Sequence, residues 1–368
     1  VVDSRTVTDK QWIAADQDPQ GRSPHAGNLY MSWTDVGGDR IVVARSTDGN
    51  RTWRPFVALA SGPVQGSVPA VGPDGTVYVA WGRRIFGGPG PGSIEVRASR
   101  NGGASFGPVH TAANITSIPY FLPNGMPGRN FRSPGSMPAF AVSPTNGFLY
   151  AAWADYRSAD ADIYLARSTD AGATWGAPVR INDDPPRNGM DQFHPQLAVA
   201  PSGRVAVMWM DRRLPCPDLE WIPAAHRGRE NFCITTFMAR STDGGETWSP
   251  NIQAGAEAWD WSVSLPTVST DRGFTTGFIG DYQGLASGPD YDYPFWAATT
   301  DLGDNADHSQ EVFVARVAAD RDYQATATPT PSATPSPTLT PTATATATPT
   351  PKPRPLYLPR LPQGATAL

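Results

Sequence analysis

Short stretches of alternating apolar and polar residues recur along most of the chain, and several of them end in an aromatic residue. Four end in tryptophan: Leu29-Tyr30-Met31-Ser32-Trp33, Val77-Tyr78-Val79-Ala80-Trp81, Leu149-Tyr150-Ala151-Ala152-Trp153 and Val205-Ala206-Val207-Met208-Trp209. Alternation with a period of two is typical of β-strands with one buried face. Helical periodicity is nearly absent, so the pattern predicts an all-β protein.

An eight-residue motif follows three of these stretches. Ser46 to Trp53 reads Ser-Thr-Asp-Gly-Asn-Arg-Thr-Trp, and related copies run from Ser168 to Trp175 and from Ser241 to Trp248. A variant from Ser99 to Phe106 carries Asn in place of Asp and Phe in place of Trp. In such a motif the short Asp or Asn side chain accepts hydrogen bonds from nearby backbone N–H groups, and glycine permits a positive φ. The aromatic ring packs against the side of the turn. We expect these structural roles for Asp48, Asp170 and Asp243 and for Trp53, Trp175 and Trp248.

The repeating unit contains four strands. A further short strand and a turn precede the Trp-ending strand, as in residues 69–75 and 197–203. Four antiparallel strands per repeat predict the blade of a β-propeller. The expected blades span about 11–58, 67–111, 138–180, 194–253 and, less regularly, 274–317. Five blades are visible, and an intact protein with more N-terminal sequence could hold six or more. The last blade lacks a corner motif, and residues 1–7 could supply its outer strand.

The serial corner motifs, the Tyr-x-Ala-Trp strands and the blade spacing resemble the sialidase (neuraminidase) superfamily and its Asp-box relatives. The resemblance covers about residues 10–317. It implies a propeller in which the Asp-box corners lie on the face away from the active site. The same corners occur in propellers with unrelated or no catalytic function, so the resemblance is specific for fold.

The composition changes abruptly from Gln324. Residues 325–351 are almost wholly Thr, Ala, Pro and Ser, which cannot bury a core. We expect a propeller over residues 1–320, an extended and disordered Thr/Pro/Ala-rich stalk over 321–354, and a short apolar tag over 355–368. The tag resembles the terminal segments that follow such stalks on exported surface proteins.

The charge and the cysteine content indicate which binding partners and which cellular compartment fit this chain. The net charge is −5 with 17% charged residues, so no basic excess favours nucleic acid or an anionic membrane. No apolar run approaches the roughly 18 residues of a membrane span. Cys216 and Cys233 fall within one insertion and favour a disulfide over a metal site, which places the chain outside the cytoplasm. We expect no cofactor, no metal and a monomer.

Charged residues gather in the links that follow the Trp-ending strands. These links and the blade-to-blade links open on one face of a propeller, opposite the corner motifs. The guanidinium group of arginine can bind a carboxylate through two hydrogen bonds, Asp accepts hydrogen bonds from hydroxyl groups, and aromatic rings stack on sugars. This face therefore suits an anionic or polyhydroxylated ligand. Alternatively, Asp155 with Arg157 and Asp211 with Arg212 staple neighbouring blades as ion pairs. His194 opens a strand, where a hydrogen bond between blades is the expected role.

The resemblance also implies candidate catalytic residues. Asp281-Tyr282-Gln283-Gly284-Leu285 resembles the segment that holds a nucleophilic tyrosine, so Tyr282 is the nucleophile candidate. Glu257, or Glu220 within the insertion, is the candidate base, and Asp35 or Asp191 the acid/base. The expected substrate-binding residues are Arg132, Arg157 and Arg212 as a carboxylate clamp, with Asp155, Asp211, Asp281 and Trp259 beside them. No N-terminal Phe/Tyr-Arg-x-Pro motif, the usual source of the first arginine, is present.

Three functions fit these observations. The leading one is a secreted or surface-displayed propeller that recognises glycans or other anionic ligands without a complete catalytic set. The alternative is an exo-α-sialidase-type glycoside hydrolase with a tyrosine nucleophile. A purely architectural component of the cell envelope is the third.

Overall fold

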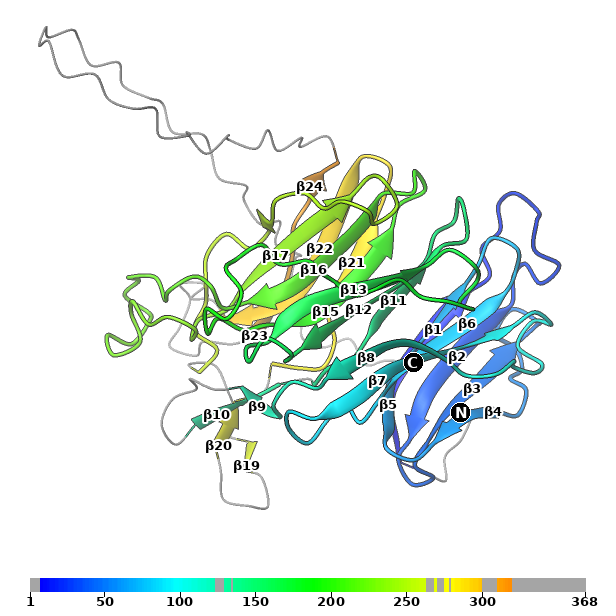
Figure 1. The fold of residues 1–368 in the computed structure, drawn as a ribbon, viewed down its shortest axis with the longest axis horizontal. Coiled ribbons are helices and arrows are strands. Elements are labelled where there is room, and N and C mark those ends of the chain that lie inside the picture. The colour runs from blue at the N-terminus through cyan, green and yellow to red at the C-terminus, as the bar shows by residue number, and fades with distance from the viewer. Residues whose placement is uncertain are drawn as a thin grey trace, which may run out of the picture.

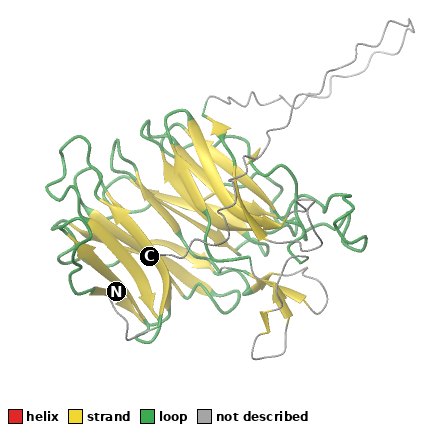
Figure 2. Ribbon diagram, turned by 180° about the vertical axis from the view of Figure 1, so that it is seen from behind, coloured by secondary structure: helices red, strands yellow, loops and turns green. Residues whose placement is uncertain are grey.

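The computed structural model describes residues 7–122, 129–133, 135–262, 268–269, 275–277, 279–299 and 310–319. Every regular element in these ranges is a β-strand (Figure 1; Figure 2). The described part of the chain therefore contains no helix that could cross a membrane. The predicted stalk and tag, over 321–354 and 355–368, lie outside the described residues, and the domain boundaries stay predictions.

Five sheets follow one another along the chain, each antiparallel, and they confirm the predicted propeller fold. Their strands are β1 (Thr8–Ala15), β2 (Leu29–Asp35), β3 (Arg40–Ser46) and β4 (Val57–Ser61) in sheet 1; β5 (Val64–Val71), β6 (Val77–Arg83), β7 (Pro91–Ser99) and β8 (His110–Thr116) in sheet 2; β11 (Ala139–Val142), β12 (Leu149–Asp155), β13 (Asp162–Ser168) and β14 (Val179–Arg180) in sheet 3; β15 (Gln192–Val199), β16 (Val205–Asp211), β17 (Thr235–Ser241) and β18 (Ile252–Gln253) in sheet 4; and β21 (Gly284–Ser287), β22 (Tyr291–Thr299), β23 (Gln310–Val314) and β24 (Val317–Ala318) in sheet 5.

A further, small mixed sheet was not expected from the sequence. It joins β9 (Phe121–Leu122), β10 (Arg129–Arg132), β19 (Val268–Ser269) and β20 (Thr275–Gly277), and β10 runs parallel to β20. These strands come from the links before sheet 3 and before sheet 5. The predicted start of the last blade at residue 274 is therefore wrong, because residues 275–277 pair with β10 and sheet 5 begins at Gly284.

The prediction for the outer strand of the last blade is also wrong for Val7. The carbonyl oxygen of Val7 accepts a hydrogen bond from Val36 N, which extends sheet 1 at 2.8 Å. In sheet 5, β24 pairs with the end of β22 through Asp292 and Val317. Residues 1–6 lie outside the described residues.

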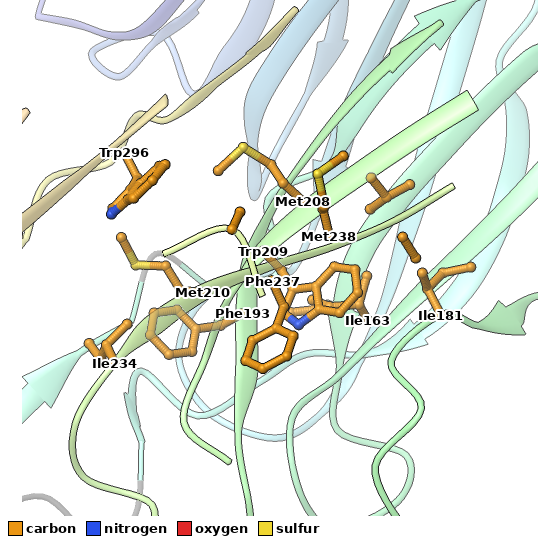
Figure 3. Close-up of a cluster of buried hydrophobic side chains, with 14 of the residues drawn as sticks. Ile163, Ile181, Phe193, Met208, Trp209, Met210, Ile234, Phe237, Met238 and Trp296 are labelled. Carbon is orange, nitrogen blue, oxygen red and sulfur yellow. The ribbon is translucent and has the colours of Figure 1, made fainter. Parts of the chain in front are cut away.

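The hydrophobic core lies between successive sheets. Each Trp-ending strand is the second strand of its sheet, and Trp81, Trp153 and Trp209 are fully buried. The largest cluster joins sheets 3, 4 and 5, where Trp296 of β22 packs near Met208 and Met210 of β16 (Figure 3). Alternate side chains of a strand point to opposite faces of its sheet. A sheet with a neighbour on each side therefore buries both faces.

The four corner motifs share one hydrogen-bond pattern. In the third copy, Ser241 Oγ donates to Asp243 Oδ1 at 2.7 Å, and Thr247 N donates to the same oxygen at 3.0 Å. Asp48, Asp170 and Asn101 hold the equivalent position in the other copies. The threonine hydroxyl and backbone N–H lower the pKa of Asp48 and of Asp170 to about 2. Each corner is thus fixed by contacts within eight residues.

Candidate functional site

The first strands of sheets 1, 2 and 4 share a β-bulge at the same position. In β1, Asp9 pairs with Thr34 and Trp12 with Ser32, so Lys10 and Gln11 both lie opposite Trp33. The irregularities of β5 and β15 place Gly66 and His194 at the equivalent position, opposite Trp81 and Trp209. All three bulged residues have a positive φ: 56° at Lys10, 71° at Gly66 and 57° at His194. Such a bulge bends the strand and redirects its side chains.

These bulges converge on one small hollow, which we call the mouth. It has a volume of about 20 Å³ and receives residues from all five sheets or their entering links: Lys10, Trp12, Gly66, Met137, Pro138, His194, Pro195, Gln196, Asp281 and Tyr282. A hollow of this size holds about one water molecule. A larger ligand would therefore lie on the mouth rather than enter it.

Two aromatic rings form the edge of the mouth. Tyr282 is 46% exposed, and its ring meets that of Trp12 edge-on, with the centroids 5.9 Å apart. Partial burial raises the pKa of the Tyr282 hydroxyl above its ordinary value of 10.0. The tyrosine is therefore protonated at neutral pH.

An ion pair lies beneath these rings. Lys10 Nζ donates to Asp281 Oδ2 at 2.6 Å and to Asp9 Oδ2 at 3.2 Å. Gln65 Nε2 donates to the same Asp9 oxygen at 2.7 Å, which adds a contact from sheet 2. Lys10 is 3% exposed, so its charge is compensated within the protein.

His194 links sheet 4 to the strand entry of sheet 5. Its Nε2 lies 2.8 Å from the carbonyl oxygen of Asp281, and Gln283 Nε2 donates to its Nδ1 at 3.0 Å. These partners assign the neutral tautomer with the proton on Nε2. Burial lowers the pKa of His194 to about 4. The histidine makes the hydrogen bond between blades expected from the sequence.

Asp155 and Asp211 have structural partners instead of the ligand contacts expected of them. Both are fully buried. Asp155 Oδ2 accepts from Trp153 Nε1 at 2.8 Å and from Arg157 Nη2 at 2.6 Å. Asp211 repeats this arrangement with Trp209 and, in contrast to the expected Arg212, with Arg213. The first pair also staples two sheets, because Asp155 Oδ1 accepts from Thr116 N and Arg157 Nη2 donates to the carbonyl oxygen of Asn114, both in β8 of sheet 2. Arg213 Nη1 donates to Asp183, on the link that leaves sheet 3.

Asp35, Asp191 and Arg212 are buried away from the mouth lining. Asp35 Oδ2 accepts from Arg40 Nε at 2.7 Å and Oδ1 from Gly38 N. Asp191 Oδ2 lies 3.4 Å from Arg212 Nη1, and Arg212 is fully buried. Because these groups are at most 1% exposed, the geometry gives no substrate access to the predicted acid/base or to this clamp arginine.

The remaining candidates are dispersed. Glu257 is exposed on the link after β18, Trp259 is buried and pairs through its backbone with Ile234, and Glu220 lies on the insertion of sheet 4. Arg132 is in β10, and its side chain lies outside the described residues. Of the predicted site residues, Tyr282 and Asp281 are the two in the mouth lining. Lys10 and Trp12 were missed, although Lys10 occupies the place of Gly66 and His194 in its repeat.

The insertion of sheet 4 is held by a disulfide and a buried pair. Cys216 and Cys233 are bonded, with their Cα atoms 5.0 Å apart. His226 Nδ1 lies 2.5 Å from Asp260 Oδ2, beside the packed rings of Phe232 and Trp261. Among the described residues, no three His, Cys, Asp or Glu side chains form a metal-binding group.

A second, larger hollow lies at the other ends of the first strands and was also missed. It measures about 940 Å³ and is lined by residues such as Ala15, Gln17, Gln20, Val71 and Pro201. Arg22 crosses its edge and donates to the carbonyl oxygen of Pro144. The residues that line it lie mainly in turns. Their local sequence predicts each turn separately and does not show that several turns surround one hollow.

Comparison with known proteins adds structural similarities. No family model and no curated protein matches the sequence. A protein of unknown function from Dyadobacter fermentans is similar at 17% identity and a TM-score of 0.47, over 87% of this chain and 81% of that one. An α-L-arabinofuranosidase from Fusarium graminearum is 14% identical, with a TM-score of 0.47 over 84% and 92% of the two chains. A Hadza microbial sialidase is 15% identical, with a TM-score of 0.44 over 83% and 55%. Similarity at this level does not identify an activity.

Proposed function

We propose that this protein is a secreted or cell-surface propeller that binds a glycan on its mouth without hydrolysing it. The observation that carries the proposal is the half-exposed ring of Tyr282, set edge-on to Trp12 beside the Lys10–Asp281 pair. Binding sites for small molecules combine apolar and aromatic surface with a few polar groups that fix orientation. The ring face can pack on a sugar, and the charged groups can meet its hydroxyls.

A binding role accounts for the scattered catalytic candidates. A tyrosine nucleophile needs an adjacent base, and Glu257 is not part of the mouth lining. Asp35 and Asp191 are committed to Arg40 and Arg212. The raised pKa of Tyr282 also disfavours its ionisation. The disulfide supports an oxidising, extracytoplasmic location.

The test is a glycan array followed by calorimetry on the glycans that bind. Replacing Tyr282 or Trp12 with Ala should weaken binding at least about tenfold, because a central aromatic residue carries much of the energy of such a contact. Gln20→Ala, in the hollow at the opposite end, is the matched control and should leave affinity unchanged. An empty array, or equal loss with all three variants, would contradict the proposal.

An assay of substrate turnover distinguishes binding from hydrolysis. A fluorogenic sialoside should release no product with the full chain. Product release that Tyr282→Phe abolishes would replace this proposal with the exo-sialidase alternative.

A further inference from the structure

Negative charge outweighs positive charge beside the mouth. Among the described residues that line it, Lys10 and Asp281 carry a charge, and Asp9, which also contacts Lys10, adds a second carboxylate. The side chain of Asp9 is 37% exposed, whereas that of Lys10 is 3% exposed. Burial lowers the pKa of His194 to about 4, so its ring adds no charge at neutral pH. Two carboxylates therefore face one ammonium group.

This imbalance extends to the exposed ring of Tyr282. Burial is the main cause of the raised pKa of the Tyr282 hydroxyl. The carboxylates of Asp9 and Asp281 raise the same pKa, and the ammonium group of Lys10 lowers it. All three charges therefore act at the surface on which a ligand would lie.

The hydrogen-bond donors beneath the two rings already have acceptors. Lys10 Nζ lies within 3.2 Å of both carboxylate oxygens of Asp9 and of Asp281 Oδ2, which gives one acceptor for each of its three N–H groups. Gln65 Nε2 donates to Asp9, and His194 Nε2 donates to the carbonyl oxygen of Asp281. A ligand carboxylate would gain no donor from these groups and would approach two like charges.

Acceptors, by contrast, are in surplus at the same place. Asp281 Oδ1 and Gln283 Oε1 are buried and have no hydrogen-bond partner among the described residues. A carboxylate in such a place is stabilised by a further positive charge nearby. The charge and the hydrogen-bonding groups thus both favour a ligand that carries a positive charge.

The aromatic edge of the mouth favours the same kind of ligand. The face of a Tyr or Trp ring is negative, so it attracts a cation. Tyr282 is 46% exposed, and Trp12 lies 5.9 Å from it between ring centroids. An ammonium group over these rings would also lie in the field of the nearby carboxylates. A ligand carboxylate in the same position would be repelled by both.

We infer that the mouth binds an amino sugar with a free, protonated amine and that it binds acidic sugars less tightly. This inference rests on the proposed function and adds the class of sugar to it. It reverses the sequence-based expectation of an anionic ligand, which depended on a clamp of arginines. Arg212 is fully buried, and Arg157 is paired with Asp155.

Three forms of one glucosamine oligosaccharide test the preference for charge. With free amines the oligosaccharide is cationic, with N-acetyl groups it is neutral, and with N-succinyl groups it is anionic. Calorimetry is carried out at about pH 5.5, where the free amines are protonated. The cationic form should bind about fivefold to tenfold more tightly than the neutral form, and the anionic form more weakly than both. Any other order of affinities would overturn the inference.

A matched pair of variants tests where the preference arises. Asp9→Asn removes one carboxylate and keeps an oxygen that can accept from Lys10 and Gln65. The ratio of affinities for the cationic and neutral forms should fall to about two or less, because the two charges that remain are opposite. Asp290→Asn makes the same change of net charge on an exposed turn at the far end of β21, and it should leave the ratio unchanged.

Each ratio compares two ligands on one protein, so a partly unfolded variant does not alter it. An unchanged ratio in Asp9→Asn would overturn the inference. An equal fall in both variants would show that the amine follows the overall charge of −5, and it would overturn the inference as well. On the glycan array, binding without preference for free amines would overturn this inference and leave the proposed function standing. An empty array would overturn both.

Discussion

The indole Nε1 of Trp209 donates a hydrogen bond of 2.8 Å to Oδ2 of Asp211, two residues further along the chain. Trp153 and Asp155 form the same contact at the same distance. Asp155 and Asp211 thus supply the acceptors for the buried indole groups of Trp153 and Trp209. Buried polar groups need such partners, and an indole N–H without one is costly.

Loss of the Asp211 carboxylate should destabilise the fold. Asp211→Ala leaves Trp209 Nε1 without an acceptor and Arg213 without its fully buried carboxylate partner. We expect the free energy of unfolding to fall by about 3 kcal/mol, as for other broken buried pairs. Urea denaturation measures it, and Asp183→Ala, whose side chain is 47% exposed, is the control. Equal effects of the two substitutions would contradict the structural role.

The contact between Lys10 and Asp281 should contribute to holding the first and last sheets together. Lys10→Met leaves Asp281 without its cation, and Asp281→Asn leaves the buried Lys10 with Asp9 alone. The double variant should lose less stability than the sum of the two single losses, because either substitution alone already breaks the pair. A double-mutant cycle on the free energy of unfolding should give a coupling of about 1–3 kcal/mol. A coupling near zero would mean that the pair adds nothing to closure.

His194 should make stability depend on pH in a defined window. Its pKa falls from 6.5 to about 4 on folding, so the unfolded chain binds the proton more readily. Stability from this residue is therefore full above pH 6.5, is lost as the pH falls toward about 4, and changes no further below it. Melting temperatures of the protein and of His194→Gln should differ in slope within this window. Parallel curves would show that His194 does not titrate as its burial requires.

Reduction of the disulfide should destabilise the insertion of sheet 4. The bond closes a loop between residues 17 apart in sequence, for which the chain-entropy model gives about 3 kcal/mol. The Cys216→Ser, Cys233→Ser double variant should melt at a lower temperature than the oxidised protein. Dithiothreitol should lower the melting temperature of the native chain and leave that of the variant unchanged. A change in both would point to an effect of the reductant other than on this bond.

The sequence by itself determined the repeating architecture. Alternation with a period of two and the corner motifs are local properties, because strand pleating and the Asp243 turn depend on neighbouring residues. They predicted the five antiparallel sheets, with bounds within about five residues of those observed except at the start of sheet 5. Local signals also placed the two cysteines within one insertion, where the structure joins them.

Tertiary structure decided which charged residues remain accessible and which residues share the mouth. From the sequence, Asp155 and Asp211 were expected to contact a ligand, but in the structure their carboxylates accept hydrogen bonds from tryptophans of the same strand. Lys10 donates to Asp281, which lies 271 positions further along the chain. Tyr150 and Tyr293 have the same register, yet one is fully buried and the other 39% exposed. Burial depends on which sheet packs against a face, and such long-range contacts leave no trace in the local alternation of residues.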